Sequence, residues 1–172
     1  VARNPDKLQT AVEVLSPLGD VTSLQVDLYN ADDLNKILEF INDENNHISY
    51  LVNAAGYFSP KAFVEHNAED YLIYMQLNQA TFFISQAVAN NMIRNNGGNI
   101  VNIGSMWGKQ AVKATPSSAY SMAKAGLHAL TQHMAMELAD YGIRVNAVSP
   151  AVVKTPIYQS FIDVSELDEA LE

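Results

Sequence analysis

The chain has 172 residues, which is long enough for one domain with a complete apolar core. Its net charge of -9 and its pI near 4.7 argue against a nucleic-acid or anionic-membrane partner, because both select a basic protein face. It contains no cysteine, which excludes disulfides and thiolate metal sites and favours the cytoplasm, and no apolar run approaches the roughly 18 residues of a membrane helix.

The first half of the chain alternates between helix and strand patterns. Asn4-Pro5 is an N-cap followed by a first-turn proline, which predicts a helix that continues to about Leu15. Val21 to Val26 reads as a short strand, and Asn30 caps a second helix whose apolar residues recur with helical period. Ile48 to Val52 is an apolar strand that ends abruptly in small residues.

The second half repeats this alternation with longer helices. A helical region from about Ala68 to Asn95 precedes an apolar strand from Asn99 to Ile103. A further helix is expected to begin after a cap at Ser117 and to end near Tyr141. Arg144 to Val148 is the last predicted strand.

Short apolar strands separated by helices indicate an α/β fold, in which a parallel sheet is doubly wound and covered by helices on both faces. No linker or repeat divides the chain, so we expect a single domain over residues 1–172. Ligands of such sheets bind at the carboxyl ends of the strands. Asp27, Asn53, Ser105 and Pro150 all fall at predicted strand ends, which predicts a shared site there.

Tyr120 and Lys124 lie four residues apart on a predicted helix and therefore share one face. A nearby ammonium group lowers the pKa of a phenol, which is what a proton-exchanging tyrosine requires. Ser105 follows a strand and can approach the phenol to hold a carbonyl oxygen. The tyrosine and lysine alone are equally compatible with an ordinary surface pair on an amphipathic helix.

Five motifs together resemble the short-chain dehydrogenase/reductase family, and they occur in family order over nearly the whole chain. They are Asp27-Leu28 after a strand, Asn53-Ala54-Ala55-Gly56, Asn78 in the long helix, the set Ser105, Tyr120 and Lys124, and Arg144 to Pro150 followed by Thr155-Pro156. The resemblance implies a Rossmann-like fold and an NAD(P)-dependent oxidoreductase, which interconverts a secondary alcohol and a ketone or aldehyde by hydride transfer.

The resemblance implies a catalytic role for four residues. Tyr120 is the acid/base, Lys124 lowers the pKa of its phenol and binds the nicotinamide ribose, and Ser105 polarises the carbonyl. Asn78 holds a water molecule through its backbone carbonyl. For each residue the alternative is structural: a half-buried helix tyrosine, a solvated lysine, a turn serine or a polar helix residue.

The resemblance also implies a set of cofactor contacts. They come from Asp27 and Leu28 at the adenine, Asn53, Ala54 and Gly56 at the adenosine ribose, Tyr120 and Lys124, and Pro150, Val153 and Thr155 around the nicotinamide. Arg3 follows directly on the family's second strand, where the family separates its two cofactors, and an arginine suits a 2′-phosphate. We therefore expect NADP in preference to NAD.

Three parts of the family pattern have no counterpart in the sequence: the first strand, the glycine-rich phosphate loop and the C-terminal strand. The resemblance thus predicts a fold truncated at both ends. Two alternatives stay open: a non-catalytic binding or scaffold protein or inactive fragment, and an epimerase or dehydratase on the same scaffold. Family members imply a homodimer or homotetramer that acts on a small molecule, and the four histidines have no metal-site spacing.

Overall fold

A computed structural model of the chain describes residues 1–113, 115–151 and 153. Its sheet has three strands in the order β1-β2-β3, with β1 at Tyr50–Asn53, β2 at Gly98–Ile103 and β3 at Ile143–Val148. The α-helices of the described residues are α1 (Pro5–Leu15), α2 (Ala31–Asn42), α3 (Ala68–Arg94) and α4 (Ser118–Glu137).

Both strand pairs are parallel, with Tyr50 opposite Asn99 and Gly98 opposite Ile143. Parallel neighbours need long crossover connections. Here α3 connects β1 to β2, and α4 connects β2 to β3. The predicted α/β alternation and the parallel sheet are therefore confirmed.

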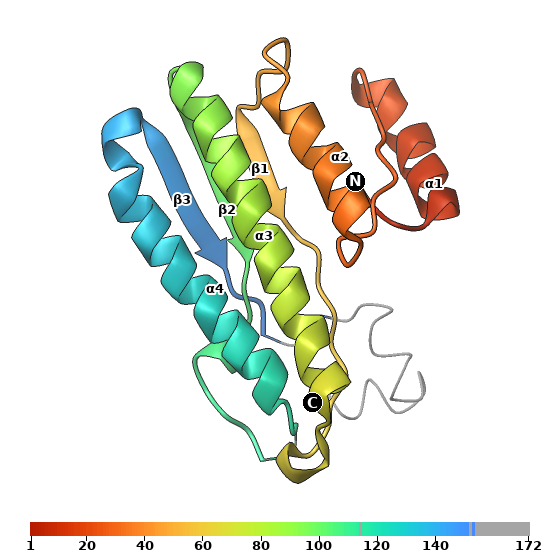
Figure 1. The fold of residues 1–172 in the computed structure, drawn as a ribbon, viewed down its shortest axis with the longest axis vertical. Coiled ribbons are helices and arrows are strands. Elements are labelled where there is room, and N and C mark those ends of the chain that lie inside the picture. Colours follow the sequence, from red (N-terminus) through yellow and green to blue (C-terminus); the bar gives the residue numbers. More distant parts are fainter. Residues whose placement is uncertain (114, 152, 154–172) are drawn as a thin grey trace.

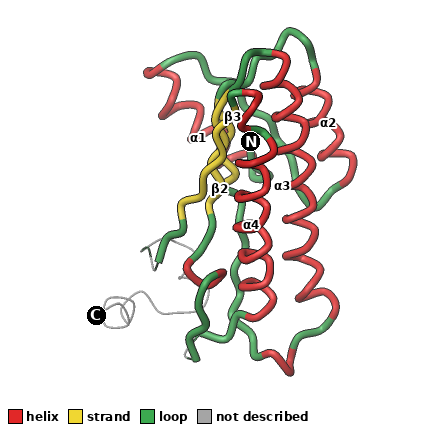
Figure 2. The backbone as a smooth tube through the Cα atoms, turned by 90° about the vertical axis from the view of Figure 1, so that its left-hand side faces the viewer, coloured by secondary structure: helices red, strands yellow, loops and turns green. Residues whose placement is uncertain are grey.

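The helices form layers on the sheet, with α2, α3 and α4 on one face and α1 on the other side (Figures 1 and 2). Residues of the helix-facing row, such as Ile100 and Val145, are buried with Val88 and Met92 of α3. The opposite face of β1 is open, because Tyr50 is 76% exposed and Val52 is 60% exposed. Packing against α3 and α4 thus holds the strand ends in place.

Local capping explains where the helices begin. The Asn4 side chain accepts a hydrogen bond from the Lys7 N–H (2.9 Å), and Asn30 accepts from two N–H groups of α2. Asn67 and Asp70 form a reciprocal capping box at the start of α3. The predicted N-caps at Asn4 and Asn30 are confirmed.

Two predicted elements differ from the structure. The strand expected over Val21 to Val26 is reduced to an isolated bridge between Ala2 and Gln25, because within the ranges given above this segment pairs on one side only, with Ala2. The last α-helix ends at Glu137, and a short 3-10 helix, Ala139–Tyr141, follows it. Gly142 takes a left-handed conformation and ends this 3-10 helix.

A cavity of about 560 Å³ separates the Ala2–Gln25 bridge from β1. Apolar side chains from both sides line it, including Val26 and Leu51. In the described part of the chain, β1 pairs with β2 alone, so its other edge faces this cavity. Unpaired strand edges beside apolar side chains promote association between molecules.

We therefore expect residues 1–172, expressed on their own, to associate through β1. Val52→Lys should reduce the association, because a charge on an edge strand disfavours strand pairing. Light scattering measures the effect, and Leu18→Lys, which changes another exposed apolar side chain, is the control. A monomer that unfolds cooperatively without either substitution contradicts the prediction.

Candidate active site

Lys124 lies on α4 and points toward the end of β2. Its Nζ donates a hydrogen bond to the Ile103 carbonyl (2.6 Å) and lies 5.8 Å from the centre of the Tyr120 ring. Burial lowers the pKa of Lys124 from its ordinary value of 10.5. The helix therefore presents a phenol and a partly desolvated ammonium group on one face, as their spacing predicts.

Ser105 follows β2 and is only 6% exposed. Its Oγ accepts a hydrogen bond from the Trp107 N–H (3.3 Å), which caps the 3-10 helix Met106–Gly108. At Gly108, a Cβ would lie 2.8 Å from the Lys124 carbonyl carbon, so only glycine lets this turn approach α4 so closely. The turn thereby fixes Ser105 beside the helix that carries Tyr120.

Asn78 joins α3 to α4 through its side chain, whose Nδ2 donates to the Ala123 carbonyl (2.9 Å). A narrow crevice runs between the two helices and the end of β1. Its lining includes Asn53, Gly56, Asn78, Tyr120 and Lys124. Three of the four predicted catalytic residues thus meet in one crevice, and Ser105 lies at the neighbouring strand end.

Aromatic residues that the sequence analysis did not single out surround Tyr120. The Phe58 ring meets the Tyr120 ring edge-on at 4.9 Å between centroids, and the Tyr74 ring lies at 6.0 Å. Tyr57 in turn packs on Tyr74 at 5.6 Å. Tyr74 precedes Asn78 by four residues on α3, and that helical spacing was the available signal for it.

The cavity beside β1 brings together every predicted cofactor residue from the first third of the chain. Its lining includes Arg3, Asp27, Leu28, Asn53, Ala54 and Gly56. Beside Gly56 the space is open, because a Cβ built there would meet no atom within 4 Å. Most of the cavity lining is apolar, so the polar and small residues at the strand ends, rather than the cavity volume, are the part of this lining that could contact a cofactor.

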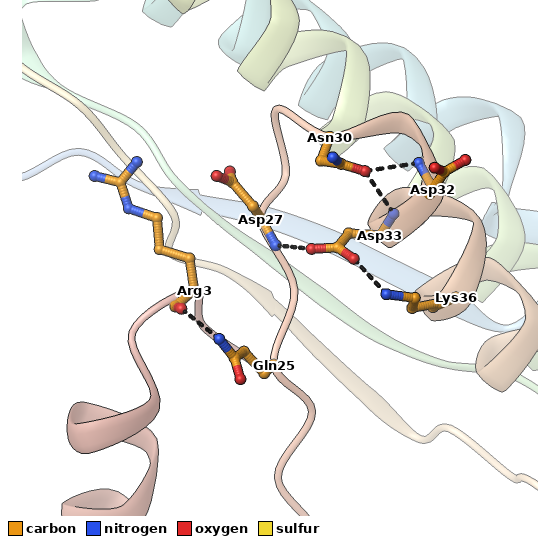
Figure 3. Close-up of polar contacts among 7 residues, drawn as sticks. All are labelled: Arg3, Gln25, Asp27, Asn30, Asp32, Asp33 and Lys36. Carbon is orange, nitrogen blue, oxygen red and sulfur yellow. Dashed lines mark hydrogen bonds and ion pairs between the residues drawn. The ribbon is translucent and has the colours of Figure 1, made fainter.

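Hydrogen bonds hold the backbone of the two charged rim residues, Arg3 and Asp27, in place (Figure 3). The Asp27 N–H donates to Asp33 Oδ2 (2.9 Å), and Gln25 Nε2 donates to the Arg3 carbonyl (3.2 Å). The hydrogen bond from Lys36 is the largest cause of the lowered pKa of Asp33. In Figure 3 the Arg3 guanidinium and the Asp27 carboxylate extend to the same side of their segments, where one ligand can meet both.

A buried polar network ties the cavity wall to α4. Asn53 Nδ2 donates to Ser85 Oγ (2.9 Å) and to Asn102 Oδ1 (2.8 Å), and Asn102 Nδ2 donates to Thr131 Oγ1 (2.9 Å). Asn102 and Ser85 are almost completely buried, so unmade hydrogen bonds here would be costly. The network fixes the backbone of Asn53 relative to the helix that carries Lys124.

The remaining predicted cofactor residues follow β3. The Pro150 carbonyl accepts a hydrogen bond from the Met106 N–H (3.1 Å), next to Ser105. Val153 is half exposed, and Thr155 lies outside the described residues. Within the described ranges, no group of three or more His, Asp or Glu side chains could hold a metal ion. Among the helices described, none is long and apolar enough to cross a membrane.

Comparison with known proteins decides the family. The family model described as short chain dehydrogenase matches residues 1–164. The chain belongs to the short-chain dehydrogenase family. It is 36% identical over 152 residues to D-arabinitol 2-dehydrogenase (ribulose-forming) of Candida albicans, covering 86% of this chain and 53% of that enzyme. The chain thus spans about half the length of the curated relatives it matches.

Solved structures of this family share the fold. A short-chain type dehydrogenase/reductase from Mycobacterium marinum superposes with a TM-score of 0.87 at 30% identity, over 99% of this chain and 68% of that chain. A short-chain dehydrogenase from Sphingobium yanoikuyae in complex with NADPH gives a TM-score of 0.85 at 32% identity, over 95% and 65% of the two chains. The Rossmann-like fold predicted by resemblance is confirmed.

Proposed function

We propose that the protein is an NAD(P)-dependent oxidoreductase that interconverts a secondary alcohol and a ketone or aldehyde. One observation carries the proposal. Asn53 and Gly56 line both the crevice of Tyr120 and Lys124 and the cavity of Arg3 and Asp27. A dinucleotide held at the cavity rim therefore extends toward the phenol.

The bound nicotinamide would supply the hydride acceptor or donor. Tyr120 exchanges the proton with the substrate oxygen, and Ser105 stabilises charge on that oxygen. Lys124 places a positive charge beside the phenol and favours its ionised form. The Asn78 backbone carbonyl holds a water molecule for proton transfer, and its side chain holds α3 against α4.

Nicotinamide absorbance tests the proposal, measured on the protein as its gene encodes it. Pentitols and their ketoses come first in the substrate panel, because a relative is named for the oxidation of D-arabinitol to ribulose. A change in absorbance with one of these pairs supports the proposal. Product formed without any net change indicates an epimerase or dehydratase, and neither product nor change indicates a binding or scaffold protein.

Arg3 supports NADP as the cofactor, as does the Sphingobium yanoikuyae neighbour solved with NADPH. We expect Arg3→Ala to weaken NADP binding far more than NAD binding, because only NADP carries a 2′-phosphate. A charge-assisted contact contributes about 1.5–3 kcal/mol, so the ratio of the two dissociation constants should change roughly tenfold or more. Fluorescence titration measures both constants.

Lys7→Ala, which removes an exposed positive charge from α1, is the control for Arg3→Ala. It should leave the ratio of dissociation constants unchanged. Equal losses for the two cofactors in Arg3→Ala, or no loss for either, would remove Arg3 from the proposed binding site.

We further propose that the protein is a homodimer or homotetramer that pairs the outer faces of α3 and α4. Phe82 and Phe83 support this, because they stand 45% and 41% exposed on α3 and pack edge-on against each other. Phe83→Glu should halve the mass measured by light scattering, since a carboxylate cannot be buried unpaired in such an interface. Phe63→Glu, outside both helices, should leave the mass unchanged.

A further inference from the structure

His128 joins α4 to the end of β3. It follows Lys124 by one helical turn, and its Nε2 lies 2.9 Å from Ser149 Oγ. Ser149 directly follows Val148, the last residue of β3. This hydrogen bond therefore connects the helix of the proposed acid/base to the segment that leads to Pro150.

The contact is built into the sheet, because Gly104 leaves room for it. A Cβ at Gly104 would lie 2.4 Å from His128 Nε2 and 2.8 Å from Ser149 Oγ. The Gly104 N–H donates to the Val148 carbonyl (2.8 Å), which keeps the two chain segments paired beyond the strands. Ser105 is the next residue, so the histidine contact lies at the residue that precedes the proposed catalytic serine.

A second backbone bond closes the arrangement on the other side of Ser149. The Met106 N–H donates to the Pro150 carbonyl (3.1 Å). Ser149 thus lies between two backbone hydrogen bonds that tie the Ser105 segment to the Pro150 segment. The Ser149 side chain contacts His128. Because the Ser105 and Pro150 segments are bonded to each other, this one contact connects both of them to α4.

The charge state of the imidazole suits this role. Burial, together with the positive charges of Lys109 and Lys124, lowers the pKa of His128 from its ordinary value of 6.5. The ring is therefore neutral at neutral pH and exchanges an uncharged hydrogen bond with Ser149. A neutral ring also adds no charge to the face that carries Lys124.

We propose that His128 is a positioning residue of the reaction: its hydrogen bond to Ser149 fixes Pro150, the expected neighbour of the nicotinamide, relative to the Ser105 hydroxyl. The inference rests on the proposed function and adds to it a residue outside the family's catalytic set. His128 touches neither substrate nor cofactor in this role, so its removal should lower kcat more than it weakens cofactor binding through Pro150.

Paired substitutions test this role in the complete protein. His128→Leu keeps bulk but removes the hydrogen bond, and kcat should fall about fivefold to tenfold, as expected for one hydrogen bond. His128→Gln should stay within about twofold of the wild type, because its terminal amide reaches the place of Nε2. His133→Leu, on an exposed part of the same helix, should change nothing.

Ser149→Ala removes the partner hydroxyl and should match His128→Leu, and the double variant should be no worse than either. Ser149→Ala also decides the case in which His128→Leu fails to fold. Three results would each overturn the inference and leave the proposed function standing. They are an unchanged kcat in Ser149→Ala, an equal loss of kcat in His128→Leu and His128→Gln, and additive losses in the double variant. A wild-type protein without turnover overturns the proposed function, and this inference with it.

Discussion

Tyr120→Phe should abolish most turnover while the fold and cofactor affinity stay nearly intact. The substitution removes the hydroxyl that exchanges the proton, and general acid/base catalysis contributes about 10²- to 10⁴-fold to a rate. The ring itself stays, with its edge-on contact to Phe58 and its packing on Tyr74. Stopped-flow or steady-state kcat measures the loss, and a fluorescence titration measures the cofactor dissociation constant.

Tyr74→Phe is a matched control, because it removes another phenol hydroxyl from the same aromatic cluster. That hydroxyl accepts from the Ser59 N–H and donates to the Ser59 carbonyl, both at 3.2 Å. Its loss should affect the stability of the loop and lower kcat less than about tenfold. A Tyr120→Phe variant that keeps more than about a tenth of wild-type turnover contradicts the acid/base role.

The sequence predicts elements whose signals lie close together along the chain. Asn4 and the N–H group that it caps are three residues apart, and the same is true within the first turn after Asn30. Tyr120 and Lys124 share a helix face by spacing alone. The segment Val21 to Val26 is different. Its apolar pattern fits a strand, but a strand also needs neighbours on its edges, and among the described residues only Ala2 pairs with it.

Residues that act across the fold escape local patterns. The role of Asn102 depends on hydrogen bonds to Asn53 and Thr131, which belong to two other elements, so the residues next to it in the sequence do not predict it. In the sequence, His128 is an ordinary polar helix residue. Its contact with Ser149 beside Gly104 depends on where β2 and β3 end in the fold. Resemblance to a family could still predict that residues far apart in the sequence, such as Arg3 and Asp27, lie near each other, because members of a family share one fold. Both residues line the same cavity.

Lys124→Met should lower kcat about 10²-fold or more and also weaken cofactor binding, since the lysine has two proposed roles. Methionine keeps much of the side-chain volume but removes the charge beside Tyr120. It also removes the hydrogen bond from Nζ to the Ile103 carbonyl, so the variant should be somewhat less stable. If neither kcat nor the cofactor dissociation constant changes, Lys124 has a structural role alone, through its hydrogen bond to the Ile103 carbonyl.

The pH dependence of kcat/KM separates the charge of Lys124 from its bulk. Burial lowers the pKa of this lysine, so the ammonium form, which the mechanism needs, is lost as pH rises through a value below the ordinary 10.5. Wild-type activity should therefore decline on the alkaline side. Lys124→Arg keeps a positive charge throughout this range, because the guanidinium pKa exceeds about 12. Whatever its residual activity, its alkaline decline should move to higher pH, and a decline that stays in place contradicts the electrostatic role of Lys124.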